Sequence, residues 1–361
     1  MGEEIISMSI TKPIILRSGS YTVDDIDALR NGNRVWEESD VFRAQLIELF
    51  GIRHPELSQA KVARLSEVFY FEVAAKDPRL AGDWVYFPWS GRLVHMISEV
   101  DYSELRTNRN KNLITAEEQK RLEQFVVGVV GLSVGASIAT SLMYSGVGKR
   151  MKLAEHDTLA TTNLNRLRAR VDQIGKTKLT IVAEQLYEIN PYAELTLFPT
   201  GLSAKTVDSF LDSTLKPQLI FEICDDFMMK VQLRRAARMR CIPVIMLTNI
   251  GDVVLIDVER FDQEPTRPLF HGAAAELEDR SADLSAAEQR EWAVRLVGEK
   301  NIPTRARESV RELGKTLVGR PQLMSSVTLS GGIAAYCARQ IALDQQFPSG
   351  RYRLSLPDIV Q

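Results

Sequence analysis

Apolar and polar residues alternate along the middle of the chain in a pattern that predicts strands and helices in turn. Short β-branched and apolar runs, such as VVGVV (126–130) and QLIFEIC (218–224), predict buried strands. Between them lie stretches with apolar residues at helical spacing, such as KTKLTIVAEQLYEIN (176–190) and MMKVQLRRAARMR (228–240). This alternation predicts an α/β fold: a Rossmann-like, mostly parallel sheet with helices on both faces.

The first hundred residues carry a different pattern, which predicts a mostly helical segment. Apolar residues recur at helical spacing in 24–32, 40–52 and 61–75. The stretch GDWVYFPWSGRLVHMI (82–97) is expected to be extended around a turn at Pro88 and Gly91. Its aromatic residues are expected to form a small core, because aromatic side chains dominate core burial.

These patterns predict three domains. An accessory, mostly helical domain is expected at 1–110, a Rossmann-like domain at 111–262, and a C-terminal region at 263–361. The last begins with a polar and charged stretch that is typical of an insertion or lid. It then continues into VTLSGGIAAYCARQIAL (327–343), expected as a strand or turn entering a helix, and a last strand RYRLSL (351–356).

Composition excludes several classes of partner. The 361 residues have a formal net charge of -2, so neither nucleic acid nor a membrane surface is expected to bind. The uncharged stretch 125–148 is long enough to span a bilayer, but it divides into a strand, a Gly/Ser turn and a helix, so we expect a buried unit. The three cysteines form no Cys-x-x-Cys pair, which predicts no zinc site and a reducing, cytoplasmic location.

A glycine loop follows the first strand of the alternating region. The sequence GLSVGAS (131–137) joins the end of VVGVV to the next helix. Gly131 permits a tight turn, Gly135 lets the backbone lie near a ligand, and the helix N-terminus offers free N–H groups to phosphate. Ser133 stands where a dinucleotide motif has its second glycine, so this loop alone is a weak signal.

Charged and polar residues gather at or directly after the expected strand ends. Glu155 lies where a Rossmann fold places the acid that binds a ribose hydroxyl, which suits NAD, FAD, S-adenosylmethionine or ATP equally. The rest of the set is Asp157, Asn163, Arg166, Lys178, Asp225 and Asp226. A dinucleotide dehydrogenase has no need of these residues. Ligands bind at the carboxyl ends of strands in an open parallel sheet, so we expect this set to surround a ligand.

At these residues the sequence resembles the ThiF/MoeB/HesA adenylyltransferases, relatives of the ubiquitin-activating enzymes. EHDTLATTNLNR (155–166) is similar to their D-x-D-x-(V)-x-x-x-N-L-x-R run, with Glu155 in place of the first Asp. Their G-K-x-K appears at 175–178, their N-P at 190–191, and their T-D-N as Cys-Asp-Asp at 224–226. LRTNRN (105–110) is similar to their L-R-Y-x-R-Q. The matches keep their order and spacing from about residue 105 to 260.

The resemblance implies ATP and Mg²⁺ as cofactors, and it implies a role for each matched residue. Glu155 would hold the ribose, while Asn163, Arg166 and Lys178 would bind the triphosphate. Asp225 would hold Mg²⁺. Arg109 would reach the nucleotide of a partner subunit, so the protein would be a homodimer with two shared sites. The substrate would be a carboxylate, either a protein or peptide C-terminus or a small acid.

The sequence departs from the family in its cysteines, and two other functions stay open. Zinc-binding pairs and a convincing catalytic cysteine are absent, so a thioester step is in doubt; we expect Cys224, Cys241 and Cys337 to be packing residues. The glycine loop and Glu155 also suit a nicotinamide or flavin oxidoreductase. The degenerate glycines also suit a non-catalytic scaffold, like the inactive partner of a heterodimeric activating enzyme.

Overall fold

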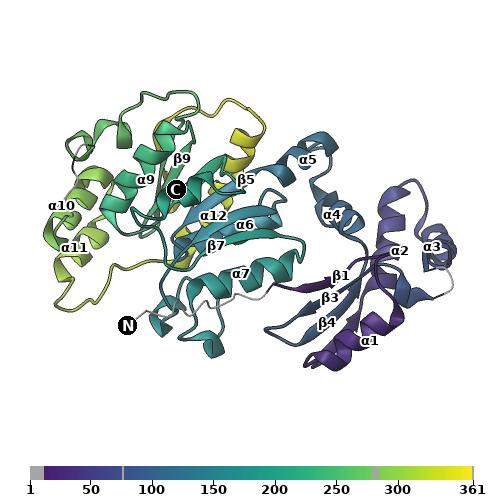
Figure 1. The fold of residues 1–361 in the computed structure, drawn as a ribbon. Helices are drawn as coiled ribbons and strands as arrows, with labels where there is room; N and C mark the ends of the chain where they lie inside the picture. Colours follow the sequence, from purple (N-terminus) through teal and green to yellow (C-terminus); the bar gives the residue numbers. More distant parts are fainter. Residues whose placement is uncertain (1–11, 75–76, 279, 281–283, 360–361) are drawn as a thin grey trace. The chain divides into compact units, whose positions relative to one another are not determined.

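A computed structural model of the protein describes residues 12–74, 77–278, 280 and 284–359 (Figure 1). Two compact units emerge from the contacts between residues. The first holds the described residues up to Ala116 together with Tyr187–Tyr192, and the second holds Glu117–Leu186 and the described residues from Ala193 onward.

The first unit combines helices with a small sheet. Its strands, in the order β1-β3-β4-β2, include an antiparallel β3–β4 hairpin and a parallel β2–β4 pair. The hairpin confirms the extended stretch and turn expected at 82–97. The elements are β1 (Ile14–Leu16), α1 (Val23–Gly32), β2 (Glu37–Asp40), α2 (Phe42–Arg53), α3 (Gln59–Ala74), η1 (Pro78–Leu80), β3 (Asp83–Phe87), β4 (Arg92–Met96), α4 (Glu99–Thr107) and η2 (Asn108–Asn110).

The aromatic residues of the hairpin are core residues of this unit, as expected. Trp84 and Tyr86 are both buried. The buried imidazole of His95 stacks on Trp84 with ring centroids 4.5 Å apart, and on Phe42 at 4.7 Å. Its Nε2 lies 2.7 Å from the carbonyl oxygen of Ala81, so this histidine has a structural role.

The second unit has a seven-stranded sheet in the order β11-β10-β9-β8-β5-β6-β7, of which β9, β8, β5, β6 and β7 run parallel. Its elements up to β8 are α5 (Ala116–Gln124), β5 (Val126–Val130), α6 (Val134–Tyr144), β6 (Arg150–Ala154), η3 (Thr161–Asn163), η4 (Val171–Gln173), α7 (Lys178–Ile189), β7 (Glu194–Phe198), α8 (Val207–Asp212) and β8 (Leu219–Glu222). The remainder are α9 (Phe227–Met239), β9 (Val244–Ile250), β10 (Val253–Glu259), η5 (Leu269–Gly272), η6 (Ala275–Leu277), α10 (Ala286–Val297), η7 (Glu299–Asn301), α11 (Thr304–Glu312), α12 (Met324–Ala342), β11 (Gly350–Ser355) and α13 (Leu356–Ile359).

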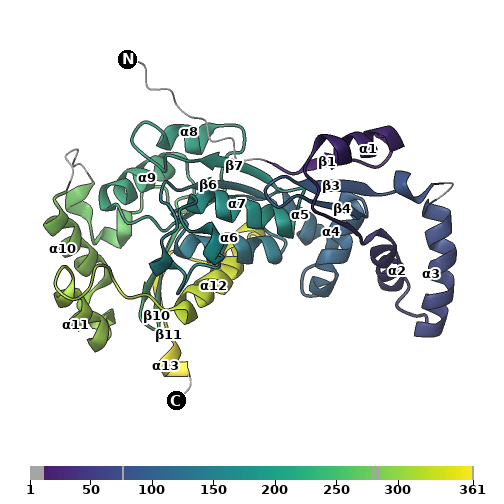
Figure 2. The same ribbon diagram turned by 90° about the horizontal axis from the view of Figure 1, so that it is seen from below.

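Helices cover both faces of this sheet, so the Rossmann-like α/β architecture expected from the sequence is present. Figure 2 shows α6 and α12 on one side of the sheet and α8 and α9 on the other, and α12 packs along α6. The strands β5 and β8 are fully buried, which explains their continuous apolar runs. A large cluster of buried side chains, including Phe210, Ile220 and Val231, fills the space between the sheet and α8 and α9.

Two details at the ends of the alternating region complete the fold. The strands β10 and β11 run antiparallel at the sheet edge, so RYRLSL forms the expected last strand. The stretch 327–343 holds no strand or turn before its helix, because nearly all of it belongs to α12. Within the described residues, no helix is both long and apolar enough to cross a membrane.

Candidate functional site

The strand order of the second unit brings three loops to one edge of the sheet. The strand β5 lies between β6 and β8, and all three run parallel, so the loops that follow them leave at the same edge. The chain moves outward on one side through β6 and β7 and then returns to the other side with β8. Such a reversal of strand order opens a crevice at the carboxyl ends of the strands, where ligands bind in open α/β sheets.

The glycine loop after β5 is shaped by Gly131. Its φ of 88° lies in the left-handed region, and a Cβ atom there would come within 2.8 Å of the carbonyl oxygen of Ile223. The loop enters α6 at Ser133, which caps the helix without a side-chain hydrogen bond. An uncapped helix N-terminus offers N–H groups and a positive dipole to an anion, and phosphate groups suit it.

Gly135 contributes through packing of the helix against the sheet. A Cβ atom at this position would lie 3.0 Å from Cγ1 of Val129 in β5. The contact shows a close approach of α6 to β5, one of the roles that glycine fulfils in dinucleotide folds. The sequence predicted close approach of a ligand at Gly135, and that expectation stays a prediction.

Glu155 joins the end of β6 to the glycine loop. Its Oε2 accepts a hydrogen bond from the N–H of Leu132 at 2.8 Å. Its Oε1 accepts two more, from the N–H groups of His156 and Asp157, at 2.8 and 3.0 Å. A carboxylate has about four acceptor positions, so three backbone bonds leave room for about one hydroxyl donor. The buried Glu155 therefore orders the loop, and a ribose contact at this residue remains a prediction.

Asp157 and Lys178 form an ion pair beside Glu155. The Nζ of the buried Lys178, the first residue of α7, donates to Oδ2 of Asp157 at 2.7 Å. This hydrogen bond lowers the pKa of the Asp157 carboxyl. Glu155, His156 and Asp157 also cluster closely enough to suggest a metal site, but three backbone N–H groups already use most of the acceptor positions of Glu155.

Arg166 connects the polar loop after β6 to the glycine loop after β5. Its Nε donates to Oγ of Ser133 at 3.3 Å, and its Nη1 donates to Oδ1 of Asn165 at 2.9 Å. Burial lowers the pKa of this guanidinium, and the negative charge of Asp225 opposes the shift. A half-buried cation of this kind is incompletely solvated, which favours binding of an anion beside it.

Asn163 lies in the same loop, at the end of η3. Its Oδ1 accepts the N–H of Ala160 at 3.0 Å, and among the described residues its side-chain NH₂ group donates no hydrogen bond. The loop is thus held by its own side chains, and the amide donors of Asn163 remain available to a ligand.

Asp225 follows β8 and has a partner that sequence reasoning missed. Its Oδ1 accepts a hydrogen bond from Nη2 of Arg320 at 2.6 Å, and both side chains are largely exposed, 88% for Asp225 and 54% for Arg320. Among the described residues, Oδ2 of Asp225 accepts no hydrogen bond. One exposed carboxylate at a strand end fits Mg²⁺, which is commonly held by one or two carboxylates with substrate phosphates and waters.

Cys224, next to Asp225, is held in a buried ionic network. Its thiol lies 3.1 Å from Oε1 of Glu222, which also receives Nζ of Lys230 at 2.7 Å. Burial raises the pKa of the Cys224 thiol well above its ordinary value, and the Glu222 charge adds to this effect. The thiolate is the nucleophilic form, so this environment disfavours thioester chemistry at Cys224.

Arg109 belongs to the first unit, at the centre of η2 (Asn108–Asn110). Its side chain is exposed, and within the described residues it makes no hydrogen bond or ion pair. No contact of Arg109 within its own unit tests the expected role, which is to reach the nucleotide of a partner subunit.

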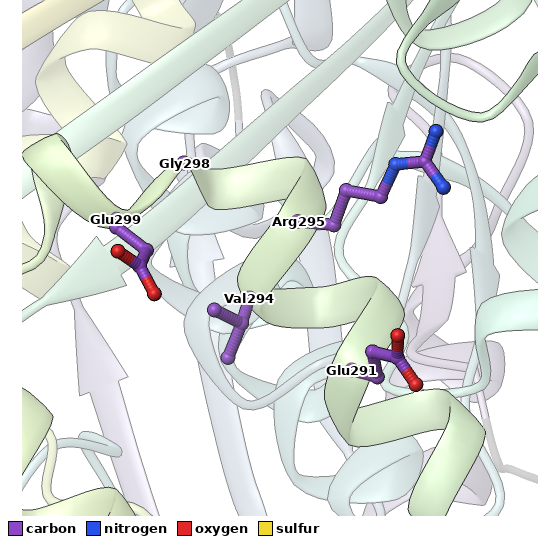
Figure 3. A pocket seen from close by; sticks show the side chains of 5 residues that line it. All are labelled: Glu291, Val294, Arg295, Gly298 and Glu299. Atoms are coloured by element: carbon purple, nitrogen blue, oxygen red, sulfur yellow. The ribbon is translucent and has the colours of Figure 1, made fainter.

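A surface pocket lies away from these loops, at the end of α10. It is lined by Glu291, Val294, Arg295, Gly298 and Glu299 (Figure 3). Arg295 pairs with Glu276 at 2.8 Å, and none of the residues expected at the candidate site contributes to the pocket. The site at the strand ends therefore stays a prediction that this pocket does not test.

Comparisons with known proteins point to one family. A model described as the ThiF family matches residues 106–278. An uncharacterized protein of Mycobacterium tuberculosis is 37% identical over 284 residues, which covers 78% of this chain and 39% of that protein. A tRNA threonylcarbamoyladenosine dehydratase of Bacillus subtilis is 30% identical over 156 residues, 43% of this chain and 59% of its own length. A ubiquitin-like modifier-activating enzyme 5 of Arabidopsis thaliana is 34% identical over 110 residues, 30% of this chain and 24% of its own length. The chain thus spans less than two thirds of each of these relatives.

Proposed function

Because residues 106–278 of this chain belong to the ThiF family, we propose that the protein is an ATP-dependent adenylyltransferase that activates a carboxylate. The observation that carries the proposal is the Arg166 contact to Ser133, which links a half-buried cation to the uncapped helix beyond the glycine loop. Phosphate groups are favoured by both features. The acceptor is the carboxylate of a protein or peptide C-terminus or of a small acid.

The reaction begins when a carboxylate oxygen of the substrate attacks the α-phosphorus of ATP. A new C–O–P linkage forms, the bond from the α-phosphorus to the bridging oxygen breaks, and pyrophosphate leaves with the electron pair. Attack brings two anions together, so catalysis requires positioning and positive charge rather than a protein nucleophile. The raised pKa of the Cys224 thiol is consistent with a reaction that uses no cysteine at this step.

The residues of the proposed site bind different parts of the nucleotide and the metal. Arg166 and Lys178 bind the phosphates, with Lys178 using donors that its bond to Asp157 leaves free. Glu155 orders the loop and offers its remaining acceptor position to the ribose. Asp225 holds Mg²⁺, which when bound neutralises charge on the phosphate oxygens. Arg109 acts from a partner subunit in a homodimer.

An oxidoreductase on the same fold is the main competitor, and nucleotide selection distinguishes the two. Calorimetry of the full chain with Mg²⁺–ATP, NAD⁺ and FAD is expected to detect binding of ATP alone. Arg166 beside the glycine loop and Lys178 beside Asp157 support this expectation, since a nicotinamide enzyme leaves these two cations without a role. Tight NAD⁺ binding with no response to ATP would contradict the proposal.

The same residues supply the catalytic test. Asp225→Asn and Arg166→Ala are each expected to lower ATP–pyrophosphate exchange by about 10²–10³-fold, because each removes a charge that stabilises the transition state. Both residues lie in surface loops, so the melting temperature should hardly change. Arg305→Ala on α11 is the matched control, since Arg305 is exposed and distant in sequence from the site. Near-normal exchange by either site variant, with a competent acceptor present, would refute the assignment of that residue.

A further inference from the structure

The segment between α11 and α12, residues 313–323, contacts the candidate site at two points. Nη2 of Arg320 donates to Oδ1 of Asp225 at 2.6 Å. Two residues later, the carbonyl oxygen of Gln322 accepts a hydrogen bond from Nδ2 of Asn165 at 2.9 Å. Asn165 in turn accepts from Arg166, so the segment is tied to both loops that carry the expected phosphate and metal ligands.

Arg320 uses few of its hydrogen-bond donors in this structure. Among the described residues, only Nη2 of Arg320 donates a hydrogen bond, although a guanidinium carries five N–H donors. The ion pair with Asp225 is mostly exposed to water on both sides. Exposed pairs of this kind contribute little to stability, about 0–1 kcal/mol, so the pair is easily exchanged for a better partner.

Under the proposed function, the phosphates of ATP would be that better partner for Arg320. When Mg²⁺–ATP occupies the site, the Asp225 carboxylate faces a divalent cation, which competes with the guanidinium for the same negative charge. A polyphosphate offers the displaced guanidinium several oxygens, and arginine binds phosphate through two parallel hydrogen bonds. Because Arg320 lies beside Asp225, the proposed metal ligand, such a contact would be made to the phosphates that share the metal.

We propose that Arg320 is a further nucleotide-binding residue, which moves from Asp225 to the β- or γ-phosphate when Mg²⁺–ATP binds. The inference rests on the proposed function, because it requires ATP at the strand ends. Arg320 would be a cation of the same chain as the rest of the site. It comes from the segment 313–323, which follows the other site residues in the sequence.

The test compares nucleotides that differ in their phosphates. Calorimetry of the full-length Arg320→Gln variant is expected to show binding of Mg²⁺–ATP about 10-fold weaker or more, as for loss of a charged hydrogen bond. Binding of AMP should stay within about 2-fold of wild type, since AMP lacks the phosphates that Arg320 contacts. Arg320→Lys should recover part of the loss because it retains the charge. Arg305→Gln is the matched control, an exposed arginine of α11.

The outcomes separate this inference from the function on which it rests. If Arg320 merely closes the site, its removal should leave binding of Mg²⁺–ATP unchanged or make it tighter, and either result overturns the proposal. Equal weakening of ATP and AMP would indicate a general structural effect and would overturn it too. If the wild-type chain fails to bind Mg²⁺–ATP at all, the proposed function itself is wrong.

Discussion

Two glycines in the second unit have the same φ angle but different surroundings. Gly131 and Gly175 both have φ of 88°. A Cβ atom at Gly131 would lie 2.8 Å from the carbonyl oxygen of Ile223, whereas nothing lies within 4 Å of the corresponding position at Gly175. The pair therefore separates the cost of a left-handed backbone from the cost of a clash.

Substitution of each glycine by alanine should reveal that difference. Gly175→Ala is expected to destabilise the protein by about 1–2 kcal/mol, the usual cost of a left-handed conformation for an L-residue. Gly131→Ala should cost a further ~1–3 kcal/mol, because the backbone of Ile223 must move to accept the methyl group. Urea unfolding of both variants measures the two values. Equal destabilisation would show that the glycine loop has room for a side chain.

The sequence predicted individual site residues where a local pattern marked them. The residues from Glu155 to Arg166 form one short motif whose spacing can be recognised in the sequence. The structure shows Arg166 in contact with Ser133 of the glycine loop. Arg320 carries no such signal. It lies in an irregular segment 95 residues from Asp225, and their contact depends on how the chain returns to the sheet before α12. Propensity and spacing contain no information about such a contact.

Among secondary-structure elements, buried charges join β8, α9 and β10. The fully buried Arg234 of α9 donates from Nη1 to Glu222 of β8 and from Nε to Glu259 of β10, both at 2.6 Å. The other oxygen of Glu259 accepts the N–H of Phe270 at 2.6 Å. The guanidinium of Arg234 thus joins α9 to β8 and β10, and Glu259 extends this network to η5.

Removal of this guanidinium should destabilise the fold strongly. Arg234→Met is expected to lower the free energy of unfolding by about 3–5 kcal/mol, because it removes the guanidinium that two buried carboxylates share and leaves Glu222 with Lys230 alone. Arg353→Met is the control, since Arg353 of β11 pairs with Asp358 at an exposed position and should cost at most ~1 kcal/mol. Urea unfolding at neutral pH gives both values. A loss of less than about 1 kcal/mol for Arg234→Met would show that the network carries little of the stability.

Acid should weaken the same network in the wild-type protein. Burial alone raises the pKa of Glu222, but the charges of Lys230 and Arg234 outweigh it and lower that pKa to about 2. A carboxyl whose pKa is lower in the folded state binds fewer protons there than in the unfolded chain. Its contribution to stability is therefore complete above about pH 4.5 and declines as the pH falls toward 2.

Elements that are buried on both faces were the easiest to predict from sequence. The strands β5 and β8 have the continuous apolar runs that such burial requires. The strand β2, with the sequence EESD, lies at a sheet edge with mostly exposed side chains, and its polar sequence resembles a loop. The stretch 327–343, which contains Gly331, was expected to enter its helix through a strand or turn. In the structure Gly331 lies inside α12, where a Cβ atom would come within 2.4 Å of Oγ of Ser141 on α6. The glycine allows two helices to pack closely, a tertiary reason that local sequence does not reveal.

At the scale of the whole molecule, the proposed site needs residues from one chain or from two. Arg166, Lys178 and Asp225 all belong to the second unit, at the carboxyl edge of its sheet. Arg109 belongs to the first unit, and its side chain makes no hydrogen bond or ion pair with the other described residues. An exposed arginine is ordinary by itself, since arginines are mostly surface residues. The resemblance of LRTNRN to the family segment therefore carries the expectation that Arg109 acts in a second subunit.

Complementation between two inactive variants tests this expectation. Arg109→Ala and Lys178→Ala should each be inactive as homodimers, because each removes a cation that stabilises the transition state. If Arg109 acts in the partner's site, a mixed dimer places both lesions in one site and leaves the other intact. Random subunit exchange makes about half of the dimers mixed, each with one intact site. About a quarter of the wild-type ATP–pyrophosphate exchange activity should therefore return when each defective site is nearly inactive.

Two further mixtures are the controls. Arg109→Ala mixed with Arg166→Ala should recover activity likewise. Lys178→Ala mixed with Arg166→Ala should not, since those two lesions then fall in separate sites and disable both. If the first mixture stays inactive after subunit exchange is demonstrated, or if the protein is a monomer at the assay concentration, Arg109 does not act in trans.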